Sequence, residues 1–315
     1  MSSLHTDPPI PARRPADASR RRRVAADRWL RRLFLGVATA SIVTLTLICL
    51  FLFREGLPIF RVVGAAEFLL GRLWYPTSIP PEFGIFALIM GSAAVTALSG
   101  TISIPLGVMT AVYLAEIASP RLREVVKPVL ELLAALPSVV VGFFGMVVVA
   151  PFLQEAFDIP TGLNLFNAAL MLAFMSVPTI CSLSEDALYS VPNSLKEASF
   201  ALGANHFETI CRVTVPAALS GICTAVILGM SRAIGETMVV LMVAGGAAMP
   251  PESLFSPTRP MPASIAAELD EAPFRSAHYH ALFATGLVLF VFTFLFNLAA
   301  DIVSNRYRRS GEATL

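Results

Sequence analysis

Residues 83–115 read FGIFALIMGSAAVTALSGTISIPLGVMTAVYLA, a run of 33 residues without a charged side chain. A stretch of about 18 or more apolar residues is typical of a helix that crosses a membrane. At about 1.5 Å per residue, a straight helix of this length measures about 50 Å. That exceeds a hydrocarbon core of about 30 Å, yet it is too short for two crossings and a turn. We therefore predict one long helix, kinked near Pro105 and Gly107, that leaves the membrane before Glu116.

Five further charge-free runs lie at 33–53, 132–154, 159–184, 213–231 and 276–300. Over its 315 residues the chain is 56% hydrophobic and 14% charged, whereas ordinary soluble domains have about 45–50% and about 25%. The mean hydropathy is +0.71. Six such runs exclude a soluble enzyme, a nucleic-acid binder and a secreted scaffold. They predict an all-α membrane protein with six transmembrane helices.

The basic residues predict which way the spans run. The first 32 residues hold nine arginines and no apolar periodicity, which predicts a disordered basic tail. With this tail in the cytoplasm, the segments placed inside hold 17 of the 23 Lys and Arg residues, and those placed outside hold 5. This is the asymmetry of the positive-inside rule, so we predict that both termini are cytoplasmic. The first hydrophobic run is longer than the 7–15 residues of a signal peptide, so we expect a retained helix.

The chain carries no signature of ATP chemistry or of a metal centre. It lacks a phosphate-cradling G-x-x-x-x-G-K-[ST] loop, and no cysteine pair has the spacing of a metal site. We therefore predict no catalytic residues, no cofactor and no metal.

Residues 194–216 read SLKEASFALGANHFETICRVTVP. Ser194 followed by Glu197 is the pattern of a capping box, and Gly203 is a natural left-handed helix stop. We predict a short cytoplasmic helix, a break at Gly203 and a second helix that ends near Pro216. The first helix has an apolar face that must be buried against the bundle or against a second protein: Leu195, Ala198, Ala201 and Leu202.

Residues 229–240 read GMSRAIGETMVV and place two charges in the fifth span. Arg232 and Glu236 are four residues apart, which puts them on one face of a continuous helix. An arginine at the centre of a span costs about 2.5–3.5 kcal/mol on insertion scales, and such charges face a bundle interior or an aqueous path. The pair is therefore either part of a transport pathway or a structural ion pair that locks helices together.

Both segments resemble parts of bacterial ABC importer permeases. Glu197-Ala198-Ser199, Gly203 and Pro216 have the spacing of the EAA loop, with Ser199 in place of the second alanine. The string RAIGETM at 232–238 is similar to the signature of phosphate-specific permeases, and its continuation is similar to the PstC type. Residues 133–145, LAALPSVVVGFFG, resemble the third-span motif of the same subunit.

The resemblance implies a type I importer permease fold in the bacterial inner membrane. Its domains would be a tail over 1–32, a first helix and periplasmic segment over 33–83, a five-helix domain over 84–303 and a cytoplasmic tail over 304–315. It implies a heterodimer with a second permease subunit, two ATP-binding subunits that supply the hydrolysis and a periplasmic phosphate-binding protein. In that family the EAA loop docks the permease on its ATPase, a role that falls here on Glu197, Ala198, Gly203 and Pro216.

The hypothesis that follows is import of inorganic phosphate past Arg232, Glu236 and Thr237. Arg232 would bind the anion, and Glu236 would weaken that binding enough for release. One alternative is an ABC permease for another oxyanion, such as molybdate or sulfate. The other is a transporter driven by an ion gradient, which would leave the segment 194–216 without a role.

Overall fold

The computed structural model describes the backbone of residues 16–312 and the side chains of residues 29–302. The chain divides between Phe51 and Leu52 into two units, which are described separately. The first unit holds most of helix α1 (Ala16–Gly56), whose large apolar side chains from Trp29 onward are exposed, as lipid-facing side chains are. The helix begins well before the span predicted at 33–53, because alanine and arginine are good helix formers. It takes in residues 16–32 of the predicted tail; residues 1–15 lie outside the described part.

Six helical segments of the described chain are long and apolar enough to cross a membrane, which confirms the predicted number of spans and the all-α class. They are Trp29–Arg61, Phe86–Ile117, Ser138–Phe157, Leu165–Tyr189, His206–Ile234 and Ala277–Ile302.

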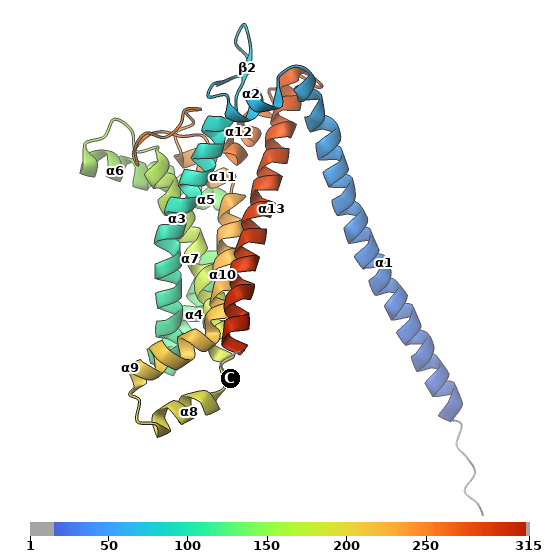
Figure 1. The fold of residues 1–315 in the computed structure, drawn as a ribbon, viewed down its shortest axis with the longest axis vertical. Helices are drawn as coiled ribbons and strands as arrows, with labels where there is room; N and C mark the ends of the chain where they lie inside the picture. The colour runs from blue at the N-terminus through green and yellow to red at the C-terminus, as the bar shows by residue number, and fades with distance from the viewer. Residues whose placement is uncertain (1–15, 313–315) are drawn as a thin grey trace, which may run out of the picture. The chain divides into compact units, whose positions relative to one another are not determined.

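Three helices form the centre of the second unit: α3 (Phe86–Val112), α7 (Leu165–Tyr189) and α10 (Val215–Ile234). Helix α3 packs along α7, and α10 packs against both (Figure 1). Glycines allow this close approach, because a Cβ atom on Gly107 or Gly229 would lie within 3 Å of the buried Ile180 side chain. Helix α13 (Ala277–Glu312) packs on α10.

The prediction of one long helix over residues 83–115 is confirmed, while the kink near Pro105 and Gly107 stays a prediction. Helix α3 contains Pro105 without interruption and continues into a widened π-helical turn, η2 (Tyr113–Ile117). The first charged residue after the apolar run, Glu116, therefore belongs to the last turn of this helix and not to a loop.

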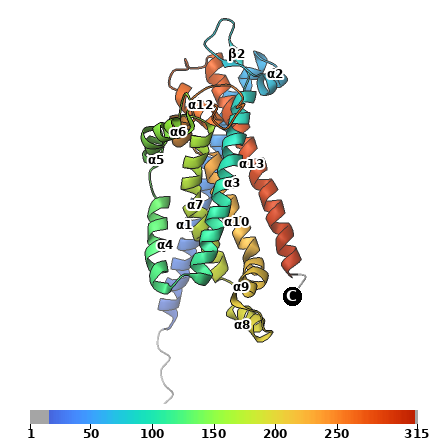
Figure 2. The same cartoon turned by 90° about the vertical axis from the view of Figure 1, so that its left-hand side faces the viewer.

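The third span differs from the run predicted at 132–154. Helix α4 (Pro120–Ala134) ends before Pro137, and the crossing segment consists of α5 (Ser138–Phe144), η3 (Gly145–Val149) and α6 (Ala150–Phe157). Pro137 explains the break, because proline lacks a backbone donor and disfavours the helical conformation of the residue before it. Helix α4 lies beside α7, with α5 beyond the break (Figure 2).

The two ends of the second unit differ in structure. At one end lie α8 (Asn193–Ala201) and α9 (His206–Thr209), and we call it the α8 end (Figures 1 and 2). The opposite end, the α12 end, is built from short elements: η1 (Leu57–Arg61), α2 (Ala65–Leu70), strands β1 (Trp74–Tyr75) and β2 (Glu82–Phe83), and α12 (Met261–Glu268). The strands pair antiparallel, with Trp74 opposite Phe83.

A buried carboxylate holds the α12 end together. The side chain of Glu268 accepts hydrogen bonds from Trp74 Nε1 at 3.0 Å and from Arg259 Nη1 at 2.5 Å. Its second oxygen lies 2.8 Å from His278 Nε2 at the start of α13. Glu268 therefore joins the distant Trp74 to Arg259 and His278, which lie before and after it in the same part of the chain.

The glycine contacts generate a stability prediction. We expect Gly229→Ala to lower the free energy of unfolding by about 1–3 kcal/mol, the range for an overpacked core, because its Cβ would lie 2.5 Å from Ile180 Cγ1. The measurement is the unfolding midpoint in detergent. Gly36→Ala is the control, since its Cβ would meet nothing within 4 Å. Equal midpoints for Gly229→Ala and the unchanged chain would contradict the close packing.

Candidate functional site

Helices α8 and α9 form a helical pair joined at Gly203. The backbone of Gly203 has φ +88°, its N–H donates to Phe200 O, and the next N–H donates to Ser199 O. This is the left-handed helix stop predicted at that position. The predicted capping box at Ser194 and Glu197 is wrong, because α8 begins at Asn193, with Pro192 in the N-cap position, and has no side-chain cap.

The capping box lies instead at the start of α9. Asn205 accepts the N–H of Glu208, and the Glu208 carboxylate accepts the N–H of Asn205. The prediction of a helix ending near Pro216 is also wrong, since α9, η4 (Ile210–Thr214) and α10 follow one another without a break. A proline clashes with the carbonyl four residues before it, and the widened π turn η4 accommodates this. The EAA-like segment therefore leads directly into the fifth span.

The apolar face predicted on α8 is mostly not covered by this chain. Leu195 packs against a buried cluster at the ends of α3, α7 and α10. Ala198 and Ala201 are exposed, and Leu202 is 90% exposed. Glu197 is also exposed on the same helix. The helix bundle therefore buries only Leu195 of this face, and the rest is available to a second protein.

Arg232 and Glu236 do not share a helix face, which corrects the prediction. Helix α10 ends at Ile234, and Glu236 lies in the short break before α11 (Met238–Val243). The Glu236 carboxylate accepts the N–H of Met238 at 3.2 Å and that of Val239 at 3.4 Å, and so caps α11. Glycine at 235 favours a helix end, and the carboxylate satisfies backbone donors that would otherwise have no partner in lipid. Thr237 is the residue before α11, and its hydroxyl donates to Gly235 O.

The Arg232 side chain lies where two helix breaks meet. Its Nη2 donates to Ala134 O, the last residue of α4, at 3.4 Å. A cation is favoured at the carbonyl end of a helix. The breaks at 135–137 and 235–237 are thus brought together by one guanidinium, although a hundred residues separate them in sequence.

Arg232 and Glu236 line the same small cavity, of about 10 Å³, beside Leu172, Met175 and Ser176 of α7. Glu236 also lines a second cavity of similar size with Ser92 and Thr96 of α3. Each holds about one water molecule at most. The Arg232 side chain is itself exposed, so the larger space next to it lies outside this chain.

A second charged cluster, not predicted, fastens α4 to α7. Arg123 lies 2.7 Å and Lys127 3.4 Å from Glu185, whose side chain is fully buried, and Lys127 also bonds Asp186 at 3.0 Å. The Arg123 guanidinium stacks 3.5 Å from the Tyr189 ring centre. In the sequence these residues are ordinary charges at the edges of apolar runs, and nothing in their spacing indicates that they pair.

Burial alone would lower the pKa of Lys127, but the hydrogen bond to Asp186 and the charges of Glu185 and Asp186 outweigh it, so the pKa is raised. A raised lysine pKa stabilises the folded chain at every pH below the ordinary value of 10.5. The contribution is lost only as the pH rises through the raised value. The contribution of Lys127 to the attachment of α4 is therefore fully present throughout the physiological pH range.

The described residues contain no group of three His, Cys, Asp or Glu side chains that could hold a metal ion. At the helix breaks, the groups that can bind a ligand are the Arg232 guanidinium, which has free donors, and the neighbouring Glu236 carboxylate.

Residues 103–309 match the family of inner membrane components of binding-protein-dependent transport systems. The chain belongs to this family and is a permease subunit of an ABC importer, with the fold class predicted from the sequence. Such subunits lie in the inner membrane and are not themselves enzymes. Family membership excludes the transporter driven by an ion gradient.

Several curated relatives share most of the chain. It is 42% identical over 261 residues to the probable ABC transporter permease protein YqgH of Bacillus subtilis, covering 82% of this chain and 84% of the relative. It is 36% identical over 248 residues to the phosphate transport system permease protein PstC of Mesorhizobium japonicum, covering 73% and 75%. The figures for PstC 1 of Mycobacterium tuberculosis are 37% over 251 residues, covering 72% and 74%. The predicted resemblance to PstC is confirmed.

Solved structures of importers share the fold. A bacterial alginate ABC transporter matches with a TM-score of 0.65 and 15% identity over 90% of this chain and 96% of the other. The inward-facing MetNI methionine ABC transporter matches with a TM-score of 0.55 and 21% identity over 69% and 93%. At these identities the likeness concerns the fold alone.

The α4 attachment yields a prediction with a matched control. We expect Glu185→Gln to lower the free energy of unfolding by about 3–5 kcal/mol, since it breaks a buried ion pair. The control is Asp186→Asn. The Asp186 side chain also pairs with Lys127 but is 62% exposed, so its loss should change the free energy of unfolding by about 1 kcal/mol or less. Detergent unfolding midpoints measure both, and equal effects of the two variants would contradict the assignment.

Proposed function

We propose that this chain is the PstC-type subunit of an ATP-driven importer of inorganic phosphate and forms half of its transmembrane pathway. The string RAIGETM at 232–238 and the relatives named PstC support this substrate. The observation that carries it is Arg232, an exposed cation that lies between the end of α4 and the break after the membrane-spanning α10.

The proposed assembly pairs this chain with a second permease subunit, two ATP-binding subunits and a periplasmic phosphate-binding protein. The α8 end faces the cytoplasm, and both termini lie on that side. The distribution of Lys and Arg supports this orientation. The exposed face of α8, with Glu197, Ala198 and Leu202, is then available to an ATP-binding subunit.

Arg232 has the free donors that an anion requires. A guanidinium carries five N–H donors, and among the described residues Arg232 makes one hydrogen bond, the long one of 3.4 Å to Ala134 O. The remaining donors can bind phosphate oxygens in the planar, paired geometry that suits arginine.

Glu236 and Thr237 refine this binding. The Glu236 charge partly neutralises the site, so the anion is not held too tightly to leave. Its oxygen can also accept a hydrogen bond from a protonated phosphate oxygen, which sulfate lacks at neutral pH. The hydroxyl of Thr237 adds a further polar group in the same break.

A second candidate is an ABC permease for molybdate or sulfate. Arg232 suits any oxyanion, and the name of the 42% identical relative from Bacillus subtilis specifies no substrate. The two candidates differ at Glu236, because only a protonated anion gains a hydrogen bond there.

The substrate is tested by uptake of labelled phosphate into proteoliposomes that hold the whole complex and ATP. We expect Arg232→Ala to reduce uptake by about tenfold or more, as loss of a charge-assisted hydrogen bond of about 1.5–3 kcal/mol implies. Glu236→Gln keeps an oxygen to cap α11 but removes the charge. It should lower the ratio of phosphate uptake to sulfate uptake.

Thr224→Ala is the control, because it removes an exposed hydroxyl from α10 that bonds only its own helix at Ser220 O. Normal uptake by both Arg232→Ala and Glu236→Gln would show that these residues are structural. Uptake of sulfate or molybdate in preference to phosphate by the unchanged complex would favour the second candidate.

Coupling to ATP hydrolysis is tested at Gly203. A Cβ at this position meets nothing within 4 Å, so a substitution acts through the backbone alone. At φ +88° valine costs about 1–3 kcal/mol, and we expect Gly203→Val to uncouple ATPase activity from uptake. Asparagine tolerates this conformation, so the Gly203→Asn complex should keep ATPase activity coupled to uptake. Full coupling in Gly203→Val would contradict the proposed role of this turn.

A further inference from the structure

Glu116 is a buried carboxylate at the end of a membrane-spanning helix, in the widened turn η2. Its side chain is 6% exposed. A buried charge is stable only when it is paired and hydrogen-bonded. Its partner lies 80 residues away in the sequence and therefore joins two distant elements of the chain.

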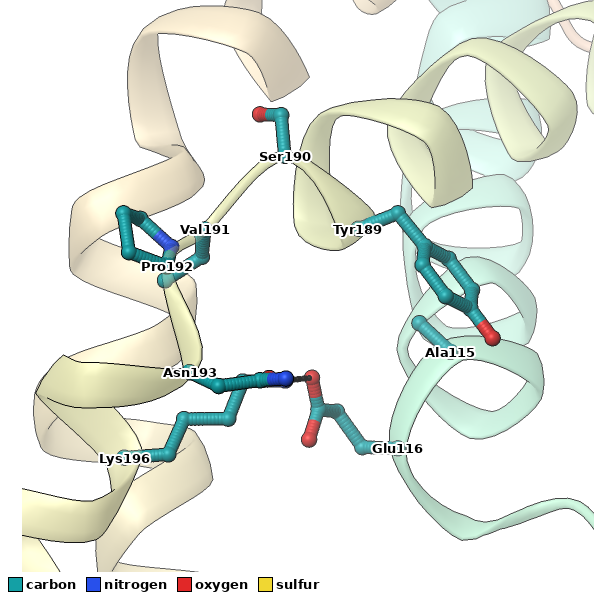
Figure 3. Close-up of a pocket in the computed structure, with 8 residues that line it drawn as sticks. All are labelled: Ala115, Glu116, Tyr189, Ser190, Val191, Pro192, Asn193 and Lys196. Atoms are coloured by element: carbon teal, nitrogen blue, oxygen red, sulfur yellow. Dashed lines mark hydrogen bonds and ion pairs between the residues drawn. The ribbon is translucent and has the colours of Figure 1, made fainter.

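That partner is Lys196 on α8, whose Nζ lies 2.6 Å from Glu116 Oε1. In Figure 3 the two side chains extend toward each other from η2 and α8. Lys196 immediately precedes the exposed Glu197, so adjacent residues of one helix face inward and outward. Among the described residues this is the one ion pair that joins α8 to a membrane-spanning helix.

The other arm of the helical pair reaches the same residue. His206, the first residue of α9, has Nε2 3.2 Å from the backbone oxygen of Glu116. Its ring stacks on Phe200 of α8. Both sides of the Gly203 turn are thus attached at Glu116.

The link from α7 into α8 borders a cavity. This cavity, of about 330 Å³, lies beside residues 189–193, between the end of α7, η2 and α8 (Figure 3). Within the link, Val191 is buried in the cluster at the ends of α3, α7 and α10. A displacement of α8 can therefore reach α7 through the chain and α3 through Glu116.

The helix that ends in Glu116 runs from the α8 end to the α12 end. Near its start, Ser92 accepts the N–H of Met261, the first residue of α12, at 2.8 Å. Ser92 and Thr96 also line the cavity beside Glu236. Helix α3 therefore connects the α8 attachment to a wall of the helix break that we assign to the pathway.

We propose that the Glu116–Lys196 ion pair is a strut that passes movement of α8 to α3 during transport. Glu116 and Lys196 are positioning residues, which act through α3 and do not touch the transported anion. The inference rests on the proposed function, because it requires an ATP-binding subunit that moves α8.

The test compares the amount imported per ATP hydrolysed by the complete complex in proteoliposomes. Glu116→Gln and Lys196→Gln each should lower this ratio by about fivefold or more, the lower end of coupling between separate sites, while the ATP-binding subunit still co-purifies. The exchanged pair, Glu116→Lys with Lys196→Glu, should recover most of the ratio. Asp186→Asn is the control, since it removes an ion pair at the same end that does not touch α8.

An unchanged ratio in both single variants overturns the strut. If a single variant fails to assemble, the exchanged pair decides: an assembled complex without recovered coupling also overturns it. These results are distinct from a failure of the proposed function, which appears in the unchanged complex as the absence of ATP-dependent phosphate uptake. If that complex imports a different anion, the ratio is measured with that anion.

Discussion

The absence of water from the lipid core is the constraint on which this structure depends. Every backbone N–H and C=O at that depth needs a partner within the protein, so an interrupted helix is tolerated only where other groups replace the lost bonds. This chain interrupts its helices at 135–137 and 235–237 and compensates with charged side chains. Glu236 caps α11, and Arg232 binds the last carbonyl of α4. The groups that repair the backbone are the same groups that can meet an anion.

Buried carboxylates at both ends of the second unit follow a related logic. Glu185 fastens α4 to α7, Glu116 fastens α8 to α3, and Glu268 gathers the start of α13 with the hairpin. Removing such a charge from water is costly unless its partners are correctly placed. Each carboxylate therefore specifies which segments meet. Their positions at the ends of helices spare the lipid core this cost and leave the middle of the bundle to the packing of small residues.

The sequence predicted the spans well, because charge-free length is a direct consequence of membrane thickness, and the left-handed stop at Gly203 followed from local backbone preference. It failed at Pro137, where the apolar run continues through a helix break and hydropathy alone carries no sign of it. It also failed at Gly235, where α10 ends between Arg232 and Glu236, which had been placed on one continuous helix. The pairing of Glu116 with Lys196 could not be predicted, since contacts across eighty residues depend on how helices pack. The capping box was predicted at Ser194 and lies at Asn205, because both segments satisfy the same short pattern and α8 already begins before Ser194, after Pro192.

In the importer that we propose, this chain supplies half of the anion site, and a second surface completes it. The cavities beside Glu236 hold about one water molecule each, too little for a tetrahedral oxyanion, whereas Arg232 is exposed with donors to spare. An unshielded guanidinium is unstable against lipid, so in the membrane this face must adjoin either water or another protein. A second permease subunit with a similar break would supply both, enclosing an aqueous space lined by the two sets of charges. Widening or narrowing of that space would then follow the relative positions of the subunits, and α3, held at Glu116 and lining the cavity beside Glu236, is the helix of this chain best placed to set them.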